Sequence, residues 1–250
     1  MRSIKLTLAY DGTAYAGWQV QPDETTVQEV LERAIEKVTG QQVRAIASGR
    51  TDAGVHALGQ VVGFRTETHL SADVLRRALN AELPHDVAVL DAADADEGFH
   101  PIRDAVCKRY RYVIHDGPVR DVFRRRYCWQ YNRRLDAAAM ARAARALLGR
   151  HDSSSFETSG AERKDSIRTI HDIQVERGRG EERNLVTIEI EADGFLYNMV
   201  RAIVGTLVEV GRGAEEEPWV AQVLAAADRR AAGPTAPPQG LFLVRVEYNS

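Results

Sequence analysis

The order of strand and helix patterns, repeated in two similar halves, is the feature that most constrains the fold of this 250-residue chain. Residues 3–10 alternate apolar and polar side chains as a strand does. After a polar loop, apolar residues recur at helical spacing, Thr26 and Glu29 form a capping box at the start of this helix, and Gly40 ends it. A second helix begins after Ser71 and ends near residue 80, and further strands are predicted at 43–48, 59–66 and 87–90. The first half is therefore β-α-β-β-α-β.

The second half continues the alternation without strict βαβ regularity. Strands are predicted at 105–115, 127–131, 167–176, 185–191 and 241–248, and helices at 136–149, within 194–211 and at 219–227. This pattern predicts an α+β fold of two similar α/β halves, in which helices flank a largely antiparallel sheet. The small and acidic segment 91–98 is typical of an exposed connection, so we expect a domain boundary near residue 100, with domains at 1–100 and 101–250.

The nine residues GRTDAGVHA, from Gly49 to Ala57, place one carboxylate in a glycine-hinged loop between two predicted strands. Gly49 and Gly54 permit backbone dihedral angles that branched residues avoid. Asp52, with Arg50 and His56 nearby, is therefore a candidate catalytic residue. An ordinary Asx turn with solvated neighbours explains the same spacing equally well, so the motif needs support from elsewhere.

Positive charge is concentrated in one segment, although the formal net charge of the chain is −3. Residues 101–134 hold ten basic and three acidic side chains. Aromatic residues, among them Tyr110 and Phe123, are interleaved with these arginines, including Arg124, Arg125 and Arg126. Phosphate contacts and base stacking require this combination, which favours a polyanionic ligand such as RNA. A hairpin whose arginines simply face water is the alternative.

Arg201 lies in the middle of the apolar helical pattern of residues 194–211. A buried guanidinium without a partner would cost several kcal/mol, so we expect an anionic partner and choose Asp52. A bidentate contact would keep this carboxylate ionised and oriented, as a nucleophile or base requires. In the alternative, the Arg201 side chain reaches solvent from the edge of the helix.

Several classes of protein are disfavoured by composition. The longest apolar stretches are interrupted by charges before they reach membrane-spanning length, and the N-terminus lacks the pattern of a signal peptide. Cys107 and Cys128 are too few for a disulfide framework and lack metal-site partners, so we expect buried thiols in a reducing cytoplasm. No dinucleotide fingerprint, phosphate-binding loop or metal-ligand spacing is present in the sequence.

Six separated segments resemble the bacterial tRNA pseudouridine synthases that modify the anticodon stem-loop, the pseudouridine synthase I family. They are GRTDAGVHA at 49–57, YDGTAYAGWQ at 10–19, KRYRY at 108–112, RTI at 168–170, GFLYNMVRAIVG at 194–205 and GLFLV at 240–244. The segments occur in the family's order and extend over essentially the whole chain. The resemblance implies the pseudouridine synthase fold, in which the two halves join into an extended central sheet.

The resemblance also implies an activity and its residues. Uridines at tRNA positions 38, 39 and 40 would be isomerised to pseudouridine without a cofactor, with Asp52 as the essential aspartate. Asp52 would attack the sugar C1′ or the uracil C6, or assist a glycal route by removing a proton. Further roles follow for Arg201 as the partner of Asp52, Tyr110 as the surface that stacks on uracil, Arg50 as the residue that helps open the RNA, and Leu241 and Leu243 as apolar wall.

The resemblance implies a homodimer that binds the tRNA anticodon stem-loop. A membrane is not expected as a partner, because no apolar stretch reaches membrane-spanning length. A non-catalytic protein that binds structured RNA would use the same basic and aromatic surface. An aspartate-dependent hydrolase is a third class, but it would ordinarily need a second acid or a metal site.

Overall fold

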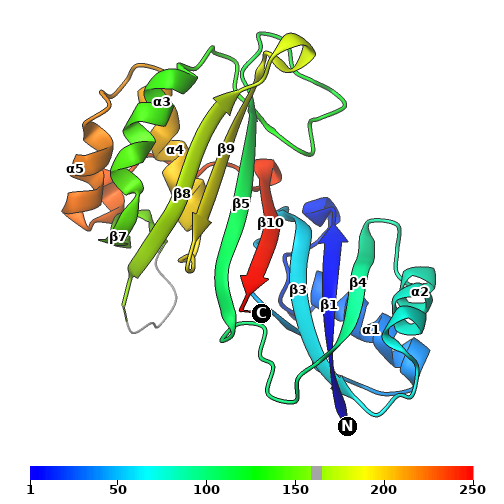
Figure 1. Ribbon diagram of the computed structural model, residues 1–250. Coiled ribbons are helices and arrows are strands. Elements are labelled where there is room, and N and C mark those ends of the chain that lie inside the picture. The colour runs from blue at the N-terminus through cyan, green and yellow to red at the C-terminus, as the bar shows by residue number, and fades with distance from the viewer. Residues whose placement is uncertain (159–164, 250) are drawn as a thin grey trace. The chain divides into compact units, whose positions relative to one another are not determined.

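The computed structural model describes residues 1–158 and 165–249, which form two compact units (Figure 1). The first unit contains residues 1–106 together with 242–250, and the second contains residues 107–241. The C-terminal strand is thus assigned to the first unit, whereas the sequence pattern placed all of 101–250 in one domain.

Strands of the first unit lie in the order β4-β1-β3-β10. Their bounds are β1 Arg2–Tyr10, β2 Ile46–Ala47, β3 His56–Thr66, β4 Val87–Ala95 and β10 Leu241–Tyr248. β1 pairs antiparallel with β3 and β4, β2 pairs antiparallel with β3, and β10 runs parallel to β3. Ile4, Leu6 and Leu8 on alternate positions of β1 are fully buried, so one face of this strand forms core.

Two capped helices belong to this unit: α1 Val27–Thr39 and α2 Ala72–Glu82. The Thr26 hydroxyl accepts a hydrogen bond from the backbone N–H of Glu29, and Ser71 accepts one from Val74, as the capping patterns predict. Gly40 ends α1 at a φ of 70°, in the left-handed region that favours glycine.

The second unit has strands in the order β5-β9-β8-β7, all antiparallel along this path, and β6 pairs parallel to β5. Helices α3, α4 and α5 lie together against the β8 and β9 side of this sheet (Figure 1). The bounds are β5 Ala105–His115, β6 Trp129–Gln130, α3 Ala137–Ala144, β7 Gly149–Asp152, β8 Ile167–Arg177, β9 Leu185–Ala192, α4 Met199–Gly211 and α5 Trp219–Ala226. Short 3-10 turns lie at Gly12–Ala14, Arg145–Leu147, Ser154–Phe156, Gly180–Glu182, Arg229–Ala231 and Pro238–Gly240.

The α+β class and the largely antiparallel pairing are confirmed within each unit. We predicted an exposed connection at 91–98, and this prediction is wrong for its first five residues. Asp91–Ala95 continue β4 and pair with β1. Helix α4 begins only at Met199, since Asn198 adopts a left-handed φ of 60° that no helix can continue through. Among the described residues, no helix is long and apolar enough to cross a membrane.

Candidate functional site

Asp52 lies half-buried in the loop that joins β2 to β3. The Val55 N–H donates to the Asp52 carbonyl oxygen at 3.1 Å and closes a four-residue turn. Gly54 has a φ of 76° at the third position of this turn, where an L side chain would be strained. The sequence prediction of a glycine-hinged loop is therefore confirmed for the backbone around Asp52.

A second loop, residues 11–19, packs directly against the Asp52 loop. The Trp18 N–H donates to the Thr51 carbonyl at 3.0 Å. A Cβ atom on Gly17 would lie 2.7 Å from the same carbonyl oxygen, and a Cβ on Gly12 would lie only 2.0 Å from the Val55 oxygen. Both glycines are thus required for the backbones to approach this closely, which fixes the loop that carries Asp52 from one side.

Four buried polar side chains hold the other side of the loop. The hydroxyls of Tyr10 and Thr51 are hydrogen-bonded at 2.8 Å, and Gln60 Nε2 lies 3.4 Å from the Tyr10 hydroxyl. Gln60 accepts from the Ser48 hydroxyl at 2.8 Å and donates to the Gly49 carbonyl at 2.8 Å. Burial raises the pKa of Tyr10 to about 12 although hydrogen bonds from Thr51 and Gln60 lower it, so this hydroxyl stays protonated. The network fastens the chain on both sides of Arg50, whose own side chain is exposed.

His56 is buried at the start of β3 and anchors the 11–19 loop. Its Nδ1 accepts from the Gly12 N–H at 3.0 Å and lies 3.1 Å from an Asp11 carboxylate oxygen. The imidazole stacks on Phe242 of β10 with 4.8 Å between ring centres. One residue further on, Leu243 is fully buried and pairs with Ala57 across the parallel strands. Packing of the turn thus accounts for the position of His56.

Tyr110 of the second unit is 8% exposed on β5. Its ring meets Phe195 edge to face, with 4.9 Å between centres and an interplanar angle of 79°. Its strand neighbour Tyr112 donates its hydroxyl hydrogen to the Pro237 carbonyl at 2.7 Å, close to Leu241 in the chain, which is also buried. Tyr110 is thus a buried ring on β5 that packs edge to face against Phe195.

Arg201 is half-buried on α4 and is oriented by groups of its own unit. Its Nε donates to the Ala236 carbonyl at 2.7 Å, and Nη1 donates to Asn198 Oδ1 at 2.8 Å. Asn198 in turn donates to the Thr158 hydroxyl at 3.3 Å. Sequence reasoning missed Asn198 and Ala236; an asparagine just before a helical pattern, a position that tolerates the left-handed region, was the available signal for Asn198.

Carboxylates neutralise much of the predicted basic segment. Arg109 is bonded to three of them, Asp172, Glu189 and Glu191, at 2.9 to 3.1 Å. Burial lowers the pKa of Arg109, but these bonds raise it by more, so the net effect is a raised pKa. The guanidinium is therefore always charged and is held in place by its three partners. Arg103, Arg111, Arg124 and Arg134 also have acidic partners. The net charge of the segment therefore overstates the charge offered to a ligand, whereas Arg125 and Arg126 are exposed.

The predicted residues fall into two groups. The first unit brings Asp52, Arg50 and Leu243 together around the start of β3. The second unit carries Tyr110, Arg201, Leu241 and the arginines at 124–126. The pairing of Asp52 with Arg201 stays a prediction.

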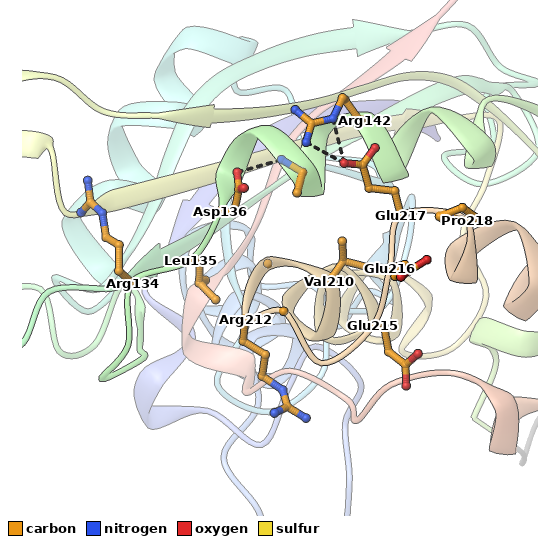
Figure 2. Close-up of a pocket in the computed structure, with 13 residues that line it drawn as sticks. Arg134, Leu135, Asp136, Arg142, Val210, Arg212, Glu215, Glu216, Glu217 and Pro218 are labelled. Carbon is orange, nitrogen blue, oxygen red and sulfur yellow. Dashed lines mark hydrogen bonds and ion pairs between the residues drawn. The ribbon is translucent and has the colours of Figure 1, made fainter.

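A pocket of about 810 Å³ between α3 and the end of α4 contains none of these predicted residues (Figure 2). Arg142 and Glu217 form an ion pair at 2.6 Å on its wall, and Asp136 caps α3 by accepting from the Ala139 N–H. Arg142 and Glu217 thus connect α3 to the segment before α5, and Asp136 caps its own helix.

Comparison with known proteins finds a family model described as tRNA pseudouridine synthase, which matches residues 7–102 and 143–249. A tRNA pseudouridine synthase A of Thermoanaerobacter sp. (strain X514) is 46% identical over 99% of this chain and 100% of its own length. Those of Brevibacillus brevis and Myxococcus xanthus are 45% and 46% identical over 99% of this chain, and over 100% and 92% of their own lengths. A chain in the crystal structure of a Cbf5-Nop10-Gar1 complex matches 98% of this chain and 48% of that chain at 12% identity, with a TM-score of 0.37, a likeness too weak to indicate function.

Proposed function

Because the chain belongs to the tRNA pseudouridine synthase family, we propose that it isomerises uridine to pseudouridine at positions 38, 39 and 40 of the tRNA anticodon stem-loop. The reaction breaks the bond from the sugar C1′ to uracil N1 and forms one from C1′ to C5, while the hydrogen on C5 is released to solvent as a proton and N1 takes up a proton from solvent. No atom is added or lost overall, and no electron pair is transferred to an acceptor. The chemistry therefore needs a nucleophile or a proton acceptor, and a pocket that holds the detached uracil.

The observation that carries this proposal is the support built around Asp52. Its loop is closed by a Gly54 turn, packed against Gly12 and Gly17, and fastened through the network of Tyr10 and Gln60. Rigid support of this kind is what a nucleophile needs, since a misplacement of ~1 Å can reduce a rate on the order of 100-fold. An aspartate in an ordinary solvated turn has no need of it.

The remaining roles follow from the residues' types and settings. Arg201, already oriented by Asn198 and Ala236, would pair with Asp52 and keep it ionised. Tyr110 would stack on the target uracil, with Leu241 and Leu243 as apolar wall. Arg50, exposed beside Asp52, would occupy the space that a flipped nucleotide leaves. The arginines at 124–126 would contact phosphates, and a homodimer acting in the cytoplasm is part of the same proposal.

Release of a label from uridine C5 tests the activity. The protein is incubated with unmodified tRNA transcript carrying tritium at C5, and the modified positions are mapped afterwards. We expect tritium in solvent without free uracil, and pseudouridine at positions 38–40. Free base would indicate a hydrolase, and unchanged RNA that still binds would indicate a binding protein; either result contradicts the proposal.

Two variants of Tyr110 separate stacking from proton transfer. Tyr110→Phe keeps the ring and should retain most of the turnover, whereas Tyr110→Leu should reduce it by at least ~5-fold, because base stacking on an aromatic ring contributes roughly 1–3 kcal/mol. Single-turnover rates with saturating enzyme give the comparison. An inactive Tyr110→Phe would show that stacking alone is an insufficient role.

A further inference from the structure

The loop between β5 and β6 presents an apolar tip to solvent. Within residues 117–127, Val119 is 75%, Val122 52% and Phe123 88% exposed. Single exposed apolar side chains are normal on protein surfaces, but three on one short loop, flanked by charged residues, are typical of a binding surface.

Hydrogen bonds at its base hold this loop in a defined conformation. Asp121 Oδ1 accepts from the N–H groups of Phe123 at 2.9 Å and Arg124 at 3.0 Å. Gln130 accepts from the Asp121 N–H at 3.3 Å and donates to the Gly117 carbonyl at 3.2 Å. The Phe123 backbone is thus fixed before any ligand arrives, which lowers the entropy cost of binding.

A pocket of about 640 Å³ lies beside the same loop, with walls that include Val119, Arg120, Arg125, Asn132 and Gln239. Within the part of the chain that the structure describes, neither Arg120 nor Arg125 has a carboxylate partner, and Arg125 donates only to the Val122 carbonyl. The side-chain amides of Asn132 and Gln239 likewise have no hydrogen-bond partner among the described residues.

Cys128 also lines this pocket and carries no charge. Burial raises the pKa of the Cys128 thiol to about 11, so this group is uncharged at neutral pH. The thiol hydrogen is donated to the Arg124 carbonyl. The pocket thus combines an apolar wall with two cations and two amides that are unpaired among the described residues. Its lining carboxylate, Asp121, already caps the turn and is not available to bind a cationic ligand.

We propose that this pocket and Phe123 bind one unpaired nucleotide of the bound RNA, outside the reaction site; the proposal rests on the proposed function. Arg120 and Arg125 would contact its phosphates, the free amides would bond to the ribose or base edge, and the Phe123 ring would stack on a base. A pocket of this volume is within the range of small-ligand sites. Loop residues 117–127 carry four arginines and one aspartate, a balance that favours a polyanion over a second protein surface.

Equilibrium binding of unmodified tRNA transcript, measured by filter retention at several salt concentrations, tests this site. All proteins carry Asp52→Asn so that the RNA stays unchanged. Phe123→Ala should weaken binding roughly 10-fold without changing the salt slope, and Phe123→Trp should restore it, because stacking is insensitive to ionic strength. Arg120→Gln should reduce the slope by ~0.7–0.9, as expected for one lost phosphate contact.

Leu90→Ala and Arg150→Gln are matched controls, because these residues are exposed outside the pocket and should leave binding unchanged. Light scattering gives the mass of each variant. Unchanged RNA affinity of Phe123→Ala would overturn the site. A fall in the mass of Phe123→Ala from that of an oligomer to that of one chain would also overturn it, because it would indicate that a second copy docks there. Tritium release by the wild-type protein reports separately on the proposed function, so either proposal can fail alone.

Discussion

At the scale of single residues, Thr51 is the contact between the loop that carries Asp52 and the buried network behind it. Its hydroxyl meets that of Tyr10 at 2.8 Å, and its carbonyl accepts from Trp18 at 3.0 Å. The carboxylate of Asp52 is attached to the next residue along the chain. A change that loosens Thr51 should therefore affect the geometry of the reaction more than the binding of RNA.

Replacing Thr51 tests this positioning role. Thr51→Val keeps the shape but leaves the buried Tyr10 hydroxyl with only the weak 3.4 Å contact to Gln60, which costs about 1–3 kcal/mol of stability. We expect kcat to fall on the order of 10- to 100-fold with KM nearly unchanged, and Thr51→Ser, which keeps the hydroxyl, to recover most of it. Steady-state tritium release gives both constants. A rise in KM at constant kcat would point to an RNA contact instead.

The residues found from sequence differ from those missed in how local their signals are. Gly54 predicts the turn at Asp52, because the tolerance of a positive φ is a property of a single residue. The contacts of Arg201 with the Ala236 carbonyl and of Thr51 with Tyr10 join residues 35 and 41 positions apart, and no local pattern encodes them.

At the scale of elements, the site depends on two loops whose backbones touch. Gly12→Ala would place a Cβ 2.0 Å from the Val55 oxygen, whereas a Cβ on Gly98 meets nothing within 4 Å. We expect Gly12→Ala to lose ~1–3 kcal/mol of unfolding free energy and most of its turnover, because backbone cannot move aside as a side chain can. Gly98→Ala should be close to wild type. Urea unfolding and tritium release measure the two effects, and equal behaviour of both variants would contradict the close approach.

Elements with strong terminal signals were predicted well, and those set by pairing partners were not. Thr26 and Ser71 precede their helices as predicted and cap them, because a cap is a contact over three residues. The acidic end of β4 was missed because it pairs with β1 only on tertiary folding. The predicted strand at 43–48 is reduced to Ile46–Ala47, where pairing with β3 is available.

At the scale of the whole molecule, acid stability depends in part on one buried carboxylate. Asp116 has a fully buried side chain and accepts from Arg177 at 2.7 Å, the Leu135 N–H at 2.9 Å and Arg134 at 3.1 Å. Burial opposes ionisation, but these bonds outweigh it and hold the pKa of Asp116 below its ordinary value. Its contribution to stability is therefore complete above its ordinary pKa and is lost as the pH falls through the lowered value.

Asp116→Asn removes this contribution. We expect the variant to be less stable at pH 7 by about 2 kcal/mol, as for hydrogen bonds to a charged group. Because protonation removes the same charge in the wild-type protein, the difference should shrink below pH ~4. Urea unfolding from pH 3 to 7 provides the curves, with Asp94→Asn as a control at an exposed ion pair, where little change is expected. A constant difference across this range would show that Asp116 acts through shape and not charge.

We propose that the uridine isomerisation depends on the Asp52 carboxylate. The most direct measurement is tritium release from C5-labelled tRNA by Asp52→Asn, which is nearly isosteric but uncharged, beside Asp23→Asn as a matched control. Asp23 is exposed at a φ of 60°, a conformation that asparagine tolerates. We predict no detectable release by Asp52→Asn, with tRNA binding and unfolding free energy kept, and wild-type release by Asp23→Asn. Near-normal release by Asp52→Asn would show that the reaction does not depend on this carboxylate.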